Sequence, residues 1–184
     1  MSLVALAAAT LAVAAPTPEA PIVVDGKPIS RGYLQHWAEI AALGSGAAVP
    51  EPVGPMDRRQ AVSLLVSRRW ILAESRELGL PVTTREEVTA SLREQRGLTF
   101  PRRAAYRRYL RETGQTTRDV RMRVALDLAS DRLREHVTAG IEDADEQQAA
   151  LETWVGEWRR KWSARTVCRR PWGGPDCGAG VRRG

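Results

Sequence analysis

The sequence lacks the residue patterns on which catalysis usually depends. No serine lies in a Gly-x-Ser-x-Gly elbow, and no glycine-rich phosphate loop is present. The two histidines, His36 and His136, lie outside Cys/His metal spacing, and we expect both to be structural. The acidic clusters at 86–87 and 142–146 fall at expected helix starts, where the helix dipole favours negative charge. We therefore expect no catalytic residue, no metal site and no cofactor.

Lysine and phenylalanine are also scarce. Lys27 and Lys161 are the only lysines, and one Phe stands against six Trp. Hydrophobic residues at 43% and charged residues at 27% indicate a globular chain, and 184 residues suit one domain. The formal net charge is +6, carried almost wholly by arginine. The base composition of the gene can account for that arginine bias, but a basic surface favours acidic partners such as envelope polymers, anionic lipid and unfolded acidic chains.

No apolar run reaches the roughly 20 residues that span a bilayer. Residues 1–15 are uncharged and apolar, and 12–14 (Ala-Val-Ala) supply the small-x-small pattern that signal peptidase accepts. This segment lacks a basic start, so either the gene begins further upstream or the leader is unusual. An apolar helix of the mature fold is the alternative, but it leaves the Pro-rich linker at 16–21 unexplained. We expect an exported protein, secreted or in the cell envelope, with no transmembrane segment in the mature chain.

Cys168 and Cys177, the two cysteines, enclose a segment rich in turn-forming residues. In an oxidising compartment a disulfide here stabilises the fold by roughly 2–3 kcal/mol. Zinc binding is the alternative, but a zinc site needs two further ligands. The sequence predicts a disulfide within a C-terminal tail at 165–184.

Periodicity in the remaining chain predicts a mostly α domain over 22–164. A short strand pair with a turn at Asp25-Gly26 precedes about six helices. Thr83 with Glu86, and Thr116 with Asp119, have the spacing of capping boxes. The expected helices start at Ser30 and run to Ala41, then cover 57–78, 83–96 (ended by Gly97), 101–113 (ended by Gly114), 116–137 and 142–164.

Two patterns have a structural and a functional interpretation. Residues 102–123 contain eight arginines with Tyr106 and Tyr109 among them, which fits a phosphate-binding face or, as we prefer, a solvated helix face with inward tyrosines. Trp154, Trp158 and Trp162 recur every four residues. We expect core packing for this stripe, with an open apolar groove as the alternative.

Three motifs, in this order, resemble the SurA- and PrsA-type foldases. Val24-Asp-Gly-Lys-Pro-Ile-Ser30 is similar to their V-N-G-x-x-I-T motif at the start of an amphipathic helix. The segment 70–84 resembles a helix closing in G-I-x-V-S/T, and 109–120 resembles F-L-x-x-x-G-x-T-x-x-D-L. The segment 158–177 is similar to the closing segment of actinobacterial-type members, with its W-x-x-x-T-x-C and final P-D-C.

The resemblance implies a SurA N-terminal-like chaperone module. In that family a parvulin-type peptidyl-prolyl isomerase domain is inserted before the last helix, but 138–145 has no room for the roughly 50 residues that a small domain needs. The implied function is binding of unfolded or extended polypeptides without catalysis. The candidate client-binding residues, in the core or its groove, are Tyr33, Trp37, Trp70, Trp154 and Trp158.

Two other functions stay open. Family membership alone would suggest a peptidyl-prolyl isomerase. The arginine run would suggest a basic binder of nucleic acid or envelope polymer, although we expect no specific nucleic acid as partner.

Overall fold

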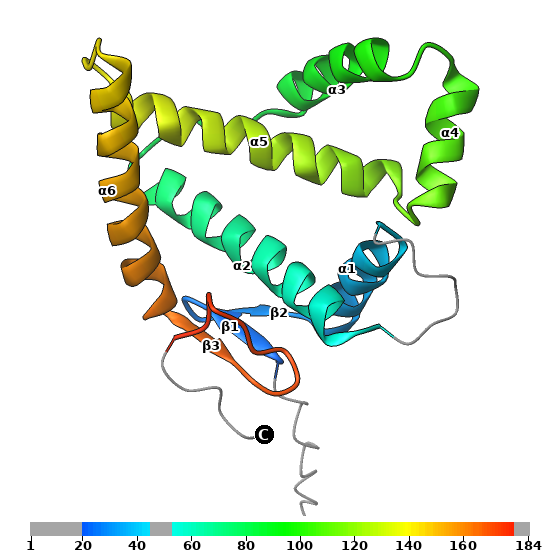
Figure 1. Cartoon of the computed structure of the whole chain (residues 1–184), viewed down its shortest axis with the longest axis horizontal. Helices are drawn as coiled ribbons and strands as arrows, with labels where there is room; N and C mark the ends of the chain where they lie inside the picture. Colours follow the sequence, from blue (N-terminus) through cyan, green and yellow to red (C-terminus); the bar gives the residue numbers. More distant parts are fainter. Residues whose placement is uncertain (1–19, 45–52, 179–184) are drawn as a thin grey trace, which may run out of the picture.

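The structure, a computed structural model, describes residues 20–44 and 53–178. The expected leader at 1–15 and most of the expected linker at 16–21 lie outside the described residues. The described part is mostly helical, which confirms the expected class (Figure 1). Its elements are β1 (Ile22–Val24), β2 (Lys27–Ile29), α1 (Arg31–Gly44), α2 (Pro55–Glu77), α3 (Arg85–Thr99), α4 (Arg103–Glu112), α5 (Thr117–Thr138), α6 (Ala144–Ser163) and β3 (Thr166–Cys168).

Side-chain caps set where several helices begin. The Thr116–Asp119 capping box is present at the start of α5, as predicted. The box predicted from Thr83 and Glu86 is wrong by one residue, because Thr84 and Glu87 form it. Since the carboxylate of Glu87 also pairs with Arg132 of α5, packing between helices fixes this register.

One predicted helix end is also wrong. Gly97 does not terminate α3, which continues to Thr99. Glycine ends a helix when its backbone turns left-handed, as Gly79 and Gly114 do here with φ of 65° and 64°. Gly97 has no such φ, and α3 ends instead at Phe100, whose ring packs against both Tyr106 and Tyr109.

The two ends of the described chain meet in one small antiparallel sheet of order β2-β1-β3. The expected pair β1–β2 places Ile22 opposite Ile29, and the unexpected strand β3 places Cys168 opposite Ile22 on the other edge of β1. The segment expected as a separate tail at 165–184 therefore contributes a strand to the domain.

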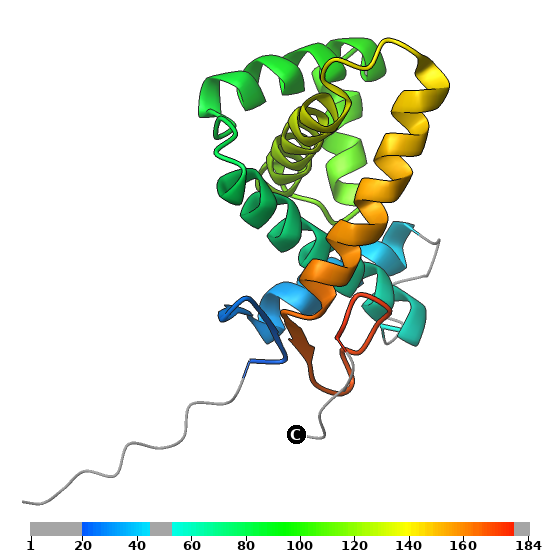
Figure 2. The ribbon, with the colours of Figure 1, turned by 90° about the vertical axis from the view of Figure 1, so that its left-hand side faces the viewer.

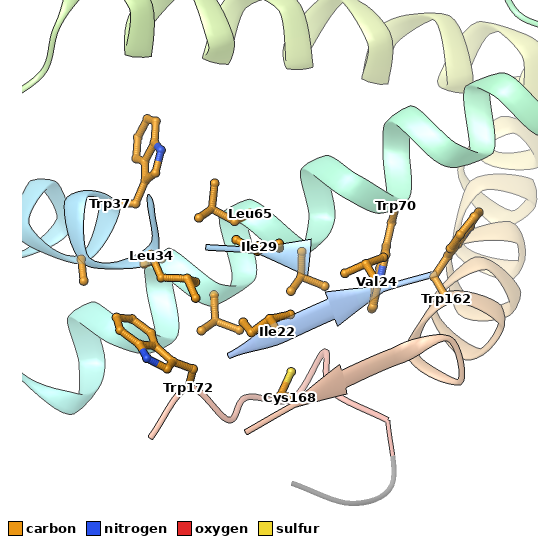
Figure 3. Packing of buried hydrophobic residues seen from close by; sticks show 14 of the residues in the cluster. Ile22, Val24, Ile29, Leu34, Trp37, Leu65, Trp70, Trp162, Cys168 and Trp172 are labelled. Carbon is orange, nitrogen blue, oxygen red and sulfur yellow. The ribbon is translucent and has the colours of Figure 1, made fainter. Parts of the chain in front are cut away.

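The predicted disulfide is present: Cys168 and Cys177 are bonded, with their Cα atoms 5.7 Å apart. It closes the loop that carries Trp172, whose ring is buried in the main core. Figure 3 shows this core between the sheet, α1, α2 and the end of α6. Its largest fully buried side chains include Trp37, Trp70 and Trp162.

The helices extend from this core in layers. Helix α5 packs against α2 on one side and α3 on the other, with Val88, Leu92 and Val124 forming a second, smaller core between α3 and α5. In Figures 1 and 2, α6 runs from the far end of α5 down to the sheet, while Figure 1 shows α4 at the opposite end of the molecule. Only residues 139–143 connect α5 to α6.

Candidate functional site

A buried carboxylate joins α6 to α2. Glu74 of α2 is 5% exposed and accepts hydrogen bonds from the indole Nε1 of Trp162 and from Nζ of Lys161, the latter at 2.8 Å. Lys161 also pairs with Glu77 at 2.6 Å. Burial lowers the pKa of Lys161, but the two carboxylates outweigh it and hold that pKa above its ordinary value. The C-terminal half of α6 is thereby tied to α2 by charged hydrogen bonds.

Aromatic packing strengthens the same joint. The indole Nε1 of Trp70, a residue 1% exposed, donates to Oγ1 of Thr166 at 2.8 Å, and that hydroxyl donates to the carbonyl of Trp162 at 2.8 Å. Trp158 meets Trp70 edge to face, with ring centroids 5.4 Å apart. Trp162 and the inner side of Trp158 thus belong to the packed interior.

The outer side of the stripe is open. A groove of about 690 Å³ lies between α2, α5 and α6, and we call it the tryptophan groove. Trp154 and Trp158 stack along it, with ring centroids 5.7 Å apart and planes inclined by 14°. Val155 is 38% exposed beside them. The remaining apolar lining is Ile71, Leu133 and Leu151.

Polar side chains complete the lining of the tryptophan groove. Gln148 and Glu152 of α6 lie one helical turn apart and share a 2.7 Å hydrogen bond, and Ser130 and Arg134 line it from α5. Such a surface accepts apolar side chains on the tryptophans and offers hydrogen-bonding groups to an extended backbone. Because the polar groups are solvent-accessible amide, carboxylate and guanidinium groups, the site favours weak binding with little sequence selectivity.

A second groove of about 600 Å³ lies between α1, α2 and α5. Its polar centre is a contact of 3.1 Å between Nε2 of His36 and Oδ2 of Asp119. Burial raises the pKa of Asp119, but hydrogen bonds from the hydroxyl and backbone N–H of Thr116 and from His36 hold it below its ordinary value. Since Asp119 is also the residue that completes the cap of α5, this contact has a structural role.

The five predicted client-binding residues occupy different places. Trp154 and Trp158 meet in the tryptophan groove, whereas Tyr33 lines the second groove. Trp37 and Trp70 are each 1% exposed and belong to the core, one of the two places that the sequence allows for them. The stripe on α6 combines both interpretations of the sequence, with core packing at its C-terminal end and an open groove at its N-terminal end.

Three contributors to the groove and to the joint beside it were not identified from the sequence. Ile71 and Leu133 approach the tryptophans from α2 and α5, and no local pattern connects them. Glu74 follows Trp70 by four residues and therefore shares its buried helix face. Because Glu74 is the one carboxylate on an otherwise apolar face of α2, its position in the sequence could have indicated a buried ion pair.

Within residues 20–44 and 53–178, no cluster of three or more His, Cys, Asp or Glu side chains is arranged to hold a metal ion. None of the helices in the same ranges combines the length and apolar character needed to cross a membrane. No protein-family model matches the sequence, and no curated protein or solved structure matches the chain. The likeness to SurA- and PrsA-type foldases thus rests on the sequence motifs.

Proposed function

We propose that this chain is an extracytoplasmic, chaperone-like module of the SurA and PrsA type that binds unfolded or extended polypeptides without catalysis. The observation that carries the proposal is the tryptophan groove, where stacked Trp154 and Trp158 line a cavity among polar side chains. The pairing of late strand β3 with β1, and the bonding of the end of α6 to α2, agree with the chaperone module that the motifs imply.

The size of the groove suits a few side chains of a client. Burying one large apolar side chain contributes about 1.5–3 kcal/mol, and ordering the client offsets part of that gain. Two or three inserted side chains therefore give weak, reversible binding. Such affinity suits a protein that must hold a folding intermediate and then release it.

The Cys168–Cys177 disulfide supports the extracytoplasmic assignment, because disulfides persist mainly in oxidising compartments. Mass spectrometry of the secreted form tests this part through the N-terminal cleavage site and the oxidation state of both cysteines. An uncleaved, reduced chain would contradict it.

The binding function is tested by suppression of the aggregation of a reduced, unfolding client protein. Val155→Arg places a charge over the apolar groove, and we expect it to remove most of the suppression by the wild-type chain. Leu98→Arg is the matched control, because Leu98 is an exposed apolar residue of α3 that does not line the groove. We expect that control to retain wild-type suppression.

The outcomes separate the site from the function. No suppression by the wild-type chain at stoichiometric ratio would contradict the chaperone proposal. Suppression that Val155→Arg and Leu98→Arg leave equally intact would remove the groove as the binding site. Turnover of a prolyl peptide by the purified chain would instead establish an isomerase.

A further inference from the structure

The positive charge of the chain is concentrated around one corner of the fold. Residues 93–111, which cover the end of α3 and nearly all of α4, contain seven arginines and one glutamate. This net charge of +6 equals the formal net charge of the entire sequence. The rest of the chain is therefore neutral overall, so this corner favours electrostatic attraction to an anionic partner.

Helix α4 displays the charge on one face. Its arginines at positions 103, 107, 108 and 111 fall within an arc of about 140° on a helix with 3.6 residues per turn. All four side chains are exposed, and none takes part in an ion pair found in the described part of the chain. Figure 1 shows α4 at the end of the molecule away from α6, where a flat partner has access to it.

The aromatic side chains of α4 face the other way. Tyr106 is buried, stacks on Tyr109 with planes inclined by 22°, and lies under the guanidinium of Arg96 at 4.2 Å from its ring centroid. Phe100 packs against both rings. Because these rings pack on one another, they do not form the stacking platform on which single-stranded nucleic acid is held.

One large apolar side chain projects at the same corner. Leu98 lies in the last turn of α3, four residues before Arg102, and is 82% exposed. A nucleic acid or an acidic polymer gains little from an exposed leucine. A lipid surface gains from both features, since phosphates pair with guanidinium groups and the leucine enters the acyl boundary.

We propose that the α3–α4 corner docks the protein on an anionic phospholipid surface. The arginine face of α4 provides the electrostatic attraction, and Leu98 inserts beside it. The tryptophan groove lies between α2, α5 and α6, so a docked chain keeps that groove clear of the α4 face.

Co-sedimentation of the full chain with lipid vesicles tests the proposal. We expect binding to mixed phosphatidylcholine–phosphatidylglycerol vesicles, weakening as salt is added, and little binding to phosphatidylcholine alone. Replacing the four arginines of α4 by glutamine should weaken binding more than about 100-fold, because each arginine near an anionic surface contributes about fivefold. The matched control replaces four scattered, exposed arginines, at positions 31, 59, 76 and 85, by glutamine and so removes the same charge. Its affinity for the vesicles should fall by about tenfold or less.

Leu98→Gln separates a membrane from other anionic partners. We expect vesicle binding to fall about fivefold at low and at high salt, because the lost contribution is apolar. The proposal would be overturned if the chain bound a short DNA duplex as tightly as the vesicles and Leu98→Gln changed neither affinity. Equal losses for the clustered and the scattered arginine variants, with circular dichroism showing both folded, would overturn it as well.

Discussion

Removing the carboxylate of Glu74 should loosen α6 from α2. In Glu74→Ala the indole N–H of Trp162 stays buried without its acceptor, which costs about 1–3 kcal/mol. Lys161 loses one charged hydrogen bond but is one-third exposed and keeps Glu77, so that loss adds only about 1 kcal/mol. We expect the free energy of unfolding to fall by about 2–4 kcal/mol in total.

Two companion variants make this prediction specific. Glu74→Gln retains an oxygen that accepts from Trp162, and the expected loss is about 1 kcal/mol. Glu77→Ala removes a more exposed carboxylate one turn further along α2, and the expected loss is about 1 kcal/mol or less. Urea unfolding followed by far-ultraviolet circular dichroism measures all three. Equal destabilisation by Glu74→Ala and Glu77→Ala would refute the reasoning that the buried indole N–H dominates.

Further expected outcomes concern other parts of the fold. Replacing Cys168 and Cys177 by serine should lower the free energy of unfolding by about 2–3 kcal/mol in urea titrations, and an unchanged midpoint would contradict a stabilising role for the disulfide. Asp119→Asn should cost about 1–2 kcal/mol at neutral pH. The folded pKa of Asp119 is below its unfolded value, so its contribution to stability is complete above about pH 4 and is lost as the pH falls further. The free energies of unfolding of wild type and variant should therefore converge in acid. A constant difference between them down to pH 2–3 would contradict this. Trp70→Phe removes the hydrogen bond to Thr166, and the free energy of unfolding should fall by about 1–2 kcal/mol, which lowers the thermal midpoint. An unchanged midpoint would show that the bond contributes nothing to stability.

Local chemistry predicted the helices well, because the signals that start and stop a helix lie close together in sequence. The Thr116–Asp119 box and the left-handed Gly114 are local features, and both are where the sequence indicates. The start of α3 after Thr84 and its continuation past Gly97 depended on tertiary contacts. These are the pairing of Arg132 with Glu87 and the aromatic packing of Phe100. A local pattern carries no information on such partners.

The sheet and the groove were harder to predict for a related reason. Strand β3 has only three residues, lies directly after a helix and ends at the first cysteine of the disulfide, so no alternation of apolar and polar residues is long enough to indicate it. The stripe of Trp154, Trp158 and Trp162 was clear, but its division into core and groove depends on α2 and α5. Periodicity identifies a face of a helix and does not state what covers it.

The position of β1 between β2 and β3 has a consequence for the order of events during synthesis. β1 is among the first parts of the described chain to be made, yet its second neighbour is among the last. Until β3 arrives, one edge of β1 has unpaired backbone groups, and Trp162 and Trp172 are missing from the core. The nascent protein must therefore pass through a stage in which its own apolar surface is exposed. Deletion of residues 166–178, which removes β3 and Trp172, should thus impair folding of the newly made chain more than an insertion of equal length at 139–143.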